Sequence, residues 1–71
     1  MKPVSKGFYY WTTSDAAAFV SRLLQNDLGS MYTWHDAVVR VTVKDDQAAA
    51  RVDALARLNL CKEGIWETKE R

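Results

Sequence analysis

The sequence predicts an α+β domain in which two helices alternate with four short strands. Valines occupy positions 39, 41 and 43 within residues 37–44, and this alternation of β-branched residues is typical of a strand with one apolar face. Apolar residues recur at helical spacing in residues 14–28 and again in residues 46–58. Strand-like and helix-like periods therefore follow one another along the chain, which indicates a sheet covered by helices.

The composition fits one small folded domain spanning residues 1–71. Of the 71 residues 48% are hydrophobic and 27% are charged, and this balance argues against a disordered chain. Ten Lys and Arg residues stand against nine Asp and Glu residues, so the formal net charge is +1. The chain therefore lacks the basic excess that is typical of proteins that bind a phosphate backbone.

The first part of the domain is expected to be a strand followed by a helix. Residues 1–6 are polar and include a proline, so we interpret them as a loose N-terminal end. Residues 7–13 are largely aromatic or β-branched and predict the first strand. Thr13 or Ser14 can cap the helix that follows, and Gly29, which tolerates positive φ, is expected to end it.

A second strand is predicted at residues 30–34, with His35 and Asp36 as the turn into the strand at 37–44. His-Asp lacks the Gly or Asn that hairpin turns usually carry, so a hairpin and one long bent strand both stay open. If the loop has an even number of residues, even positions before it share a face with odd positions after it. Tyr32, Trp34, Val39 and Val41 would then face the core, and Met31, Thr33 and Arg40 would lie on the other face.

Asp45 or Asp46 is expected to cap the helix at residues 46–58. Its predicted inward residues are Ala48, Val52, Leu55 and Ala56, and its predicted outward residues are Arg51, Asp53 and Arg57. Residues 60–64 would form a loop, residues 65–68 a short last strand and residues 69–71 a charged tail. The resulting order is the ferredoxin-like split βαββαβ arrangement, with two helices packed on one face of a four-stranded antiparallel sheet.

The uncovered face of this sheet is the candidate binding surface. Because consecutive strand residues point to opposite faces, Phe8 with Tyr10 and Tyr9 with Trp11 are alternative outward pairs. Tyr, Trp and Arg are the residues that most often dominate the energetics of protein interfaces. The predicted partner-binding residues are Arg40, Tyr9, Trp11, Phe8, Tyr10 and Met31.

No arrangement of residues in the sequence predicts a catalytic, metal or cofactor site. His35 beside Asp36 is interpreted as part of a turn, because the chain has no second histidine. Cys61 stands alone, which excludes an internal disulfide, and it is interpreted as a small buried hydrophobe. Adjacent Asp45 and Asp46 would point apart, and no Gly-rich phosphate loop is present.

These observations predict a small non-enzymatic module, such as an inhibitor or adaptor, that binds a protein partner or a second copy of itself. RNA or single-stranded DNA on the same face is an alternative, although the third strand lacks the aromatic residues of an RNP1-like run. A small enzyme subunit is a second alternative. No signal peptide or apolar run of about 20 residues is evident, so we expect a cytoplasmic protein without membrane contact.

Overall fold

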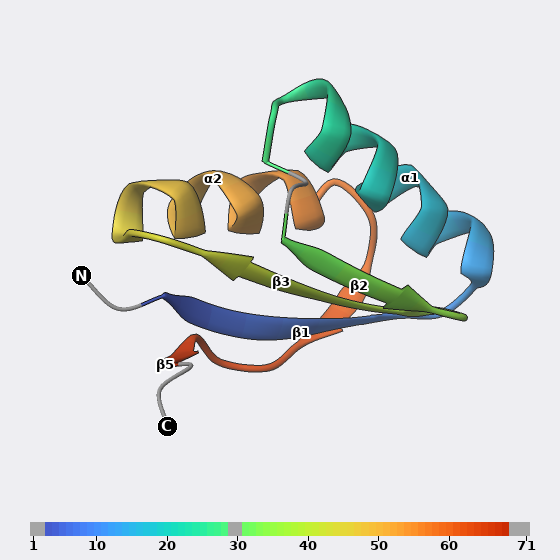
Figure 1. Cartoon of the computed structure of the whole chain (residues 1–71). Coiled ribbons are helices and arrows are strands. Elements are labelled where there is room, and N and C mark those ends of the chain that lie inside the picture. The colour runs from blue at the N-terminus through green and yellow to red at the C-terminus, as the bar shows by residue number, and fades with distance from the viewer. Residues whose placement is uncertain (1–2, 29–30, 69–71) are drawn as a thin grey trace.

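Two helices cover one face of an antiparallel sheet (Figure 1). The computed structural model describes residues 3–28 and 31–68. The helices are α1 (Thr13–Gln25) and α2 (Asp46–Ala56), and the strands are β1 (Val4–Tyr10), β2 (Tyr32–His35), β3 (Val38–Val43), β4 (Cys61–Glu63) and β5 (Glu67–Thr68). The strand order is β2-β3-β1-β4, and β5 also pairs with β1. The predicted ferredoxin-like split is therefore confirmed.

The central strand β1 begins at Val4, so the prediction of a loose end over residues 1–6 is wrong for the last three of them. Residues 1–2 lie outside the described residues. From Val4 to Tyr9 the strand pairs with β3, and on its other edge it pairs with β4 and β5. Ser5, Lys6 and Gly7 have little intrinsic preference for strands, but pairing on both edges outweighs that local preference.

Both helices begin at a capped N-terminus. Thr12 caps α1, one residue before the earlier of the two predicted caps, and its hydroxyl accepts a hydrogen bond from the Asp15 amide at 3.1 Å. Asp45 caps α2, as one of the two predictions had it, and its carboxylate accepts a hydrogen bond from the Ala48 amide at 2.8 Å. Each cap satisfies a backbone donor that the helix itself leaves without a partner.

Helix α1 ends in a Schellman motif. The Leu28 amide donates to the Leu23 carbonyl at 2.8 Å and the Asp27 amide donates to the Leu24 carbonyl at 3.2 Å. Asp27 takes the left-handed backbone conformation, with φ of 59°. Gly29, the predicted helix end, lies outside the described residues. The chain thus takes positive φ two residues earlier, at an aspartate, a residue type that tolerates this conformation.

Strands β2 and β3 form a hairpin, and the alternative of one long bent strand is wrong. The two-residue turn begins at Asp36, whose φ is 56°, so it lies one residue later than predicted. The loop has an even number of residues, and the predicted sharing of faces is confirmed: Tyr32 pairs with Val41 and Trp34 pairs with Val39. Trp34 is nevertheless exposed, because β2 is the edge strand.

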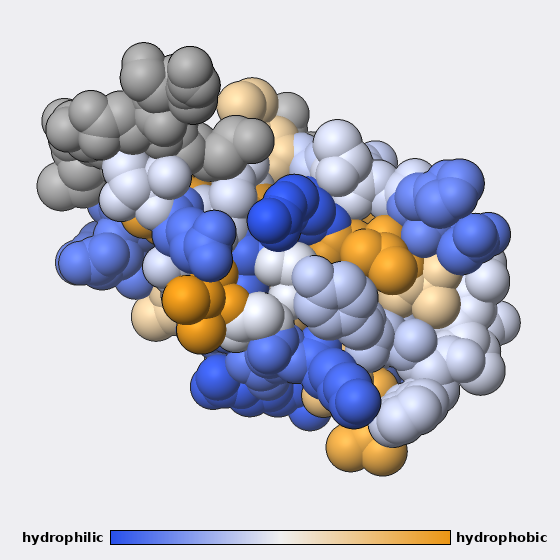
Figure 2. Space-filling view, turned by 90° about the horizontal axis from the view of Figure 1, so that it is seen from below, coloured by the Kyte–Doolittle hydropathy of each residue, from blue (hydrophilic) through white to orange (hydrophobic). Residues whose placement is uncertain are grey.

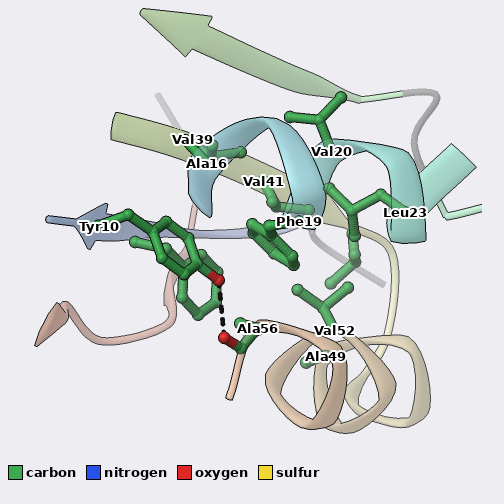
Figure 3. Close-up of a cluster of buried hydrophobic side chains, with 12 residues drawn as sticks. Tyr10, Ala16, Phe19, Val20, Leu23, Val39, Val41, Ala49, Val52 and Ala56 are labelled. Carbon is green, nitrogen blue, oxygen red and sulfur yellow. Dashed lines mark hydrogen bonds between the residues drawn. The ribbon is translucent and has the colours of Figure 1, made fainter. Parts of the chain in front are cut away.

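The core lies between the sheet and the helices (Figure 3). Phe8 and Phe19 form its centre as an edge-to-face pair with ring centroids 5.1 Å apart. Of the predicted inward residues of α2, Val52 and Ala56 are buried and Ala48 and Leu55 are only half-buried, whereas Ala49, which was not predicted to face inward, is buried. The buried apolar residues are Phe8, Tyr10, Ala16, Phe19, Val20, Leu23, Val39, Val41, Val43, Ala49, Val52 and Ala56.

The C-terminal segment follows β1 more closely than predicted. Residues 61–63 form β4, so the prediction of a loop over 60–64 is wrong for them, and only residues 67–68 of the predicted last strand are strand. Between the two, the Gly64 amide donates to the Gly7 carbonyl at 2.9 Å and Trp66 packs against the core. The charged tail predicted at 69–71 lies outside the described residues. In the described part of the chain, no helix has the length and apolar character needed to cross a membrane.

Candidate functional site

The helices leave one face of the sheet uncovered, and we call it the open face. Alternation and strand pairing place on it Ser5, Gly7, Tyr9, Thr33, His35, Val38, Arg40, Thr42, Lys62 and Glu67. Trp11 and Met31 continue this alternation just beyond β1 and β2. Figure 2 views the molecule from this side and shows hydrophilic residues interspersed with separate apolar patches.

The structure decides which aromatic pair of the first strand points outward. Tyr9 is 45% exposed and Trp11 is 64% exposed, whereas Phe8 is fully buried and Tyr10 nearly so. Phe8 and Tyr10 point toward the helices, where both contact Phe19. Of the two alternatives, the open face therefore carries Tyr9 and Trp11, and Phe8 and Tyr10 are core residues that no partner can reach.

Tyr9 lies across Gly7 beside Arg40. A Cβ atom built on Gly7 would lie 2.8 Å from Tyr9 Oη and 3.4 Å from Arg40 Nη1. Gly7 is buried although it faces the open side, since these side chains cover it. The absence of a side chain at position 7 therefore allows the Tyr9 phenol to lie down against the sheet next to the guanidinium.

Arg40 occupies the middle of the open face without an acidic neighbour across the strands. Its cross-strand partners are Gly7 on β1 and Thr33 on β2, and neither carries a charge. Within residues 3–28 and 31–68, Arg40 and Lys62 take part in no ion pair. Lys62 lies opposite Tyr9 on β4. The centre of the open face is therefore basic, although the whole chain carries a formal charge of only +1.

Met31 lies at one end of the open face. Its carbonyl accepts a hydrogen bond from the Thr42 amide at 2.8 Å, and its side chain is exposed. A shallow cavity of about 460 Å³ adjoins it at the end of β3. The described residues that line this cavity are Pro3, Met31, Thr42, Val43, Lys44 and Asp45.

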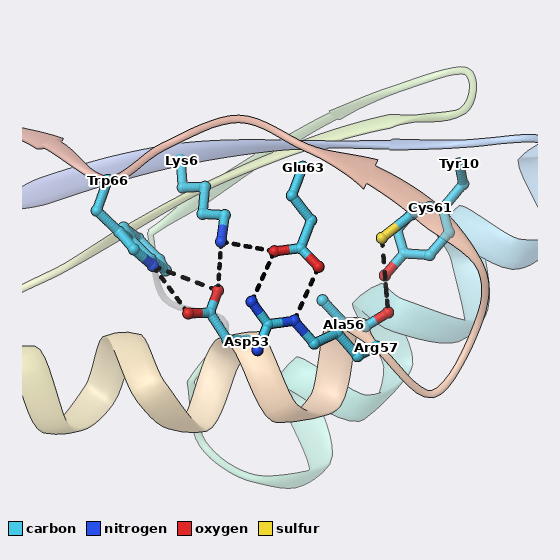
Figure 4. A network of polar contacts seen from close by, with 8 residues as sticks. All are labelled: Lys6, Tyr10, Asp53, Ala56, Arg57, Cys61, Glu63 and Trp66. Carbon is cyan, nitrogen blue, oxygen red and sulfur yellow. Dashed lines mark hydrogen bonds and ion pairs between the residues drawn. The ribbon is translucent and has the colours of Figure 1, made fainter.

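The opposite side of the sheet holds a charge network, centred on the buried Lys6, that the sequence did not reveal (Figure 4). Lys6 is only 4% exposed, and its Nζ donates to Asp53 Oδ1 at 2.7 Å and to Glu63 Oε1 at 2.8 Å. The same ammonium lies 5.0 Å from the Phe8 ring centroid and 5.6 Å from that of Trp66. The prediction that Asp53 points outward is wrong, because it faces Lys6 across the edge of the core.

Arg57 extends this network with two hydrogen bonds to Glu63, at 2.8 Å from Nε and 2.9 Å from Nη2. The hydrogen bonds from Arg57, and then those from Lys6, lower the pKa of Glu63 to about 2 against the opposing effect of burial. Burial by itself would lower the pKa of Lys6, but its hydrogen bonds to Asp53 and Glu63 raise that pKa above the ordinary value. The network joins β1, α2 and β4, so its evident role is structural.

Acid should weaken this network through Glu63. A carboxylate whose pKa is lowered by folding stabilises the protein above its unfolded pKa of 4.5, and that contribution is lost as the pH falls toward about 2. We expect Glu63→Gln to be less stable than the wild type at neutral pH and to lose less further stability on acidification. Urea unfolding of both proteins across this pH range measures the difference, and parallel pH curves would contradict the assignment.

The residues with potential reactivity have structural partners or lie exposed. The Tyr10 hydroxyl donates to the Ala56 carbonyl at 2.7 Å, and the Cys61 thiol approaches the same oxygen at 3.8 Å. Burial raises the pKa of Tyr10 and of Cys61, so both groups stay protonated at neutral pH. His35 lies 3.4 Å from Asp36 in the hairpin turn, and both side chains are exposed. The described residues contain no group of three potential metal ligands.

These features define one candidate surface and one structural network. The open face brings together Tyr9, Arg40 and Lys62, with Trp11 and Met31 at its ends. The charge network supports the opposite side of the same strands. Comparison of the chain with protein-family models, with curated proteins and with solved structures finds no match.

Proposed function

We propose that this chain is a small non-enzymatic interaction module that binds a protein partner through the open face. One observation carries the proposal: on a face that no helix covers, Tyr9 is exposed beside Arg40, and Trp11 is exposed at the end of the same face. Exposed aromatic side chains next to an arginine are the composition found at the centres of protein interfaces. An inhibitor or an adaptor is the kind of protein that acts by such contact alone.

The contact of the Tyr9 side chain with Gly7 supports this proposal. A side chain already held in one position loses less conformational entropy when a partner binds. Tyr9 also keeps its hydroxyl available next to Arg40, so the surface offers both apolar area and hydrogen-bond donors. A partner that covers these exposed rings removes apolar area from water, which favours association.

RNA or single-stranded DNA is the alternative occupant of the open face. Proteins that bind a phosphate backbone neutralise several phosphates with Lys and Arg side chains. The described strands of the open face supply only Arg40 and Lys62 as exposed cations, and β5 adds the acidic Glu67 to the same face. This charge count favours a protein partner.

We also propose that the protein acts in the cytoplasm. Cys61 is a free thiol. Free thiols persist in reducing compartments, whereas oxidising ones favour disulfides. This supports the predicted location.

We expect alanine at Tyr9 or Trp11 to weaken partner binding by about 2 kcal/mol or more, as truncation at a hot spot does. Leu24→Ala is the matched control, because Leu24 is an exposed apolar residue on α1. The chain is first used as bait to capture a partner, and affinities of the purified pair are then measured by calorimetry. Equal affinity for wild type, Tyr9→Ala and Trp11→Ala, with the fold intact, would exclude the open face as the binding surface.

A further inference from the structure

Two hydrogen-bond donors, the Tyr9 hydroxyl and the Arg40 guanidinium, lie next to Gly7 on the open face. Tyr9 Oη and Arg40 Nη1 both lie within 3.4 Å of the position that a Gly7 Cβ would take. A hydroxyl and a guanidinium placed together can both donate to one carboxylate, and hydrogen bonds to a charged acceptor are among the strongest in proteins. Within the described residues, neither the Tyr9 hydroxyl nor the Arg40 guanidinium donates a hydrogen bond to a carboxylate.

The surroundings of these two donors favour a negatively charged group. Arg40 has Gly7 and Thr33 as its cross-strand neighbours, and Lys62 lies opposite Tyr9. By contrast, the carboxylates of Asp53 and Glu63 lie on the helix side, where Lys6 and Arg57 already pair with them. Glu67 lies on the open face at its β5 edge, opposite Ser5. Within residues 3–28 and 31–68, no carboxylate forms an ion pair with Arg40 or Lys62.

We infer that Tyr9 and Arg40 form an anchor for a carboxylate of the partner, so that the open face selects an acidic segment of another protein. This inference rests on the proposed function and names the chemistry of the partner. Gly7 is part of the anchor, because any side chain there would push the phenol away from the guanidinium. Charge complementarity of this kind gives an interface its specificity and raises its association rate.

The same charges disfavour a second copy of the chain as the occupant. A two-fold dimer places the same patch of each copy against the other. Two open faces packed in this way would bring the Arg40 and Lys62 side chains of both copies together in one interface. Like charges brought close together repel, so the partner is a different surface with the opposite charge.

The inference predicts selective binding of an acidic peptide. The ¹⁵N-labelled full chain is titrated with an acetylated, amidated peptide of six glutamates, and with the corresponding peptide of six glutamines. We expect the glutamate peptide to shift the resonances of Gly7, Tyr9 and Arg40, including the Arg40 side-chain Nε–H, and the shifts to shrink with added salt. The glutamine peptide should leave these resonances unchanged.

Variants separate the anchor from general attraction to a basic surface. Arg40→Gln should weaken binding of the glutamate peptide at least fivefold, whereas Arg51→Gln, which removes an exposed charge from α2, should change it less than twofold. Gly7→Ala keeps every donor but displaces the end of the Tyr9 side chain, so it should also weaken binding while the fold is retained. Tyr9→Phe tests the hydroxyl alone, and it should weaken binding less than Arg40→Gln does.

Several outcomes would overturn the inference. Absence of shifts at Gly7, Tyr9 and Arg40, equal shifts with both peptides, or equal losses in Arg40→Gln and Arg51→Gln would each contradict the anchor. Tighter binding of a ten-nucleotide oligothymidine to the same residues would assign the site to nucleic acid. Self-association through these residues would assign it to a second copy. If a captured partner depends on Tyr9 and Trp11 but not on Arg40, the carboxylate anchor fails and the proposed function stands.

Discussion

Val41→Asp is expected to unfold the domain, whereas Thr42→Asp should leave it folded. Val41 is fully buried in the core between the sheet and the helices. Its cross-strand neighbour Lys6 already binds two carboxylates, so a third would have no cation to pair with. An unpaired buried charge costs more than about 4 kcal/mol, which is comparable with the whole stability of a domain of this size.

The neighbouring position provides the control. Thr42 lies on the open face, and its hydroxyl is 2.5 Å from that of Ser5. An aspartate there can accept a hydrogen bond from Ser5 and reach water, so we expect a loss of about 1 kcal/mol or less. Circular dichroism of both variants during thermal unfolding gives the comparison. Equal damage from the two changes would mean that both faces of β3 are buried.

Lys6→Met is expected to cost about 3–5 kcal/mol, the second largest effect. Methionine fills much of the space of the lysine stem but leaves the Asp53 carboxylate without its cation, and among the described residues only the Trp66 side chain still donates to that carboxylate. Lys62→Met is the matched control, because Lys62 is an exposed lysine on β4, and it should cost less than about 0.5 kcal/mol. Urea unfolding of both variants measures the free energies.

A double variant tests whether the charge itself causes that loss. Adding Asp53→Leu to Lys6→Met removes the carboxylate that was left without a cation, and replacing a whole buried ion pair by apolar groups is often nearly neutral. We therefore expect the double variant to be more stable than Lys6→Met alone. A loss below about 1 kcal/mol in Lys6→Met, or a double variant less stable than the single one, would contradict the network's role.

The regular periods of the sequence predicted most of the fold. Valine alternation in β3 and the apolar stripes of α1 and α2 dictate which sides of these elements are buried, and the even hairpin loop then determines the faces of Tyr32 and Trp34. The element order could therefore be read before the structure, because each element carries its own local period.

The features that the sequence could not predict depend on pairing between distant segments. Ser5 and Lys6 have weak strand propensity, but both pair with β3 and Ser5 also pairs with β5, strands that lie far away along the chain. Lys6 is accepted in the core because Asp53 and Glu63 reach it, and these contacts span 47 and 57 residues of sequence. One signal was available, since Lys6 shares its face with Phe8 and Tyr10 at a spacing of two.

The candidate surface was predictable only as a choice between two alternatives. Four successive aromatic residues in a strand require that two point outward, but local sequence does not say which two. The choice follows from the packing of Phe8 and Tyr10 against Phe19. The side chains of Tyr9 on β1 and Arg40 on β3 both lie over Gly7. This contact joins two strands, so the spacing of the residues in the sequence did not reveal it.

The most direct test of the open face as the functional surface is a cross-saturation measurement by NMR. The deuterated, ¹⁵N-labelled chain is mixed with its unlabelled captured partner, and saturation is transferred from the partner's protons to nearby amides. The account predicts intensity losses at Gly7, Tyr9 and Arg40 on the open face, and none at Leu24 or Arg51 on the helices. Losses confined to the helices, with the open face unaffected, would contradict it.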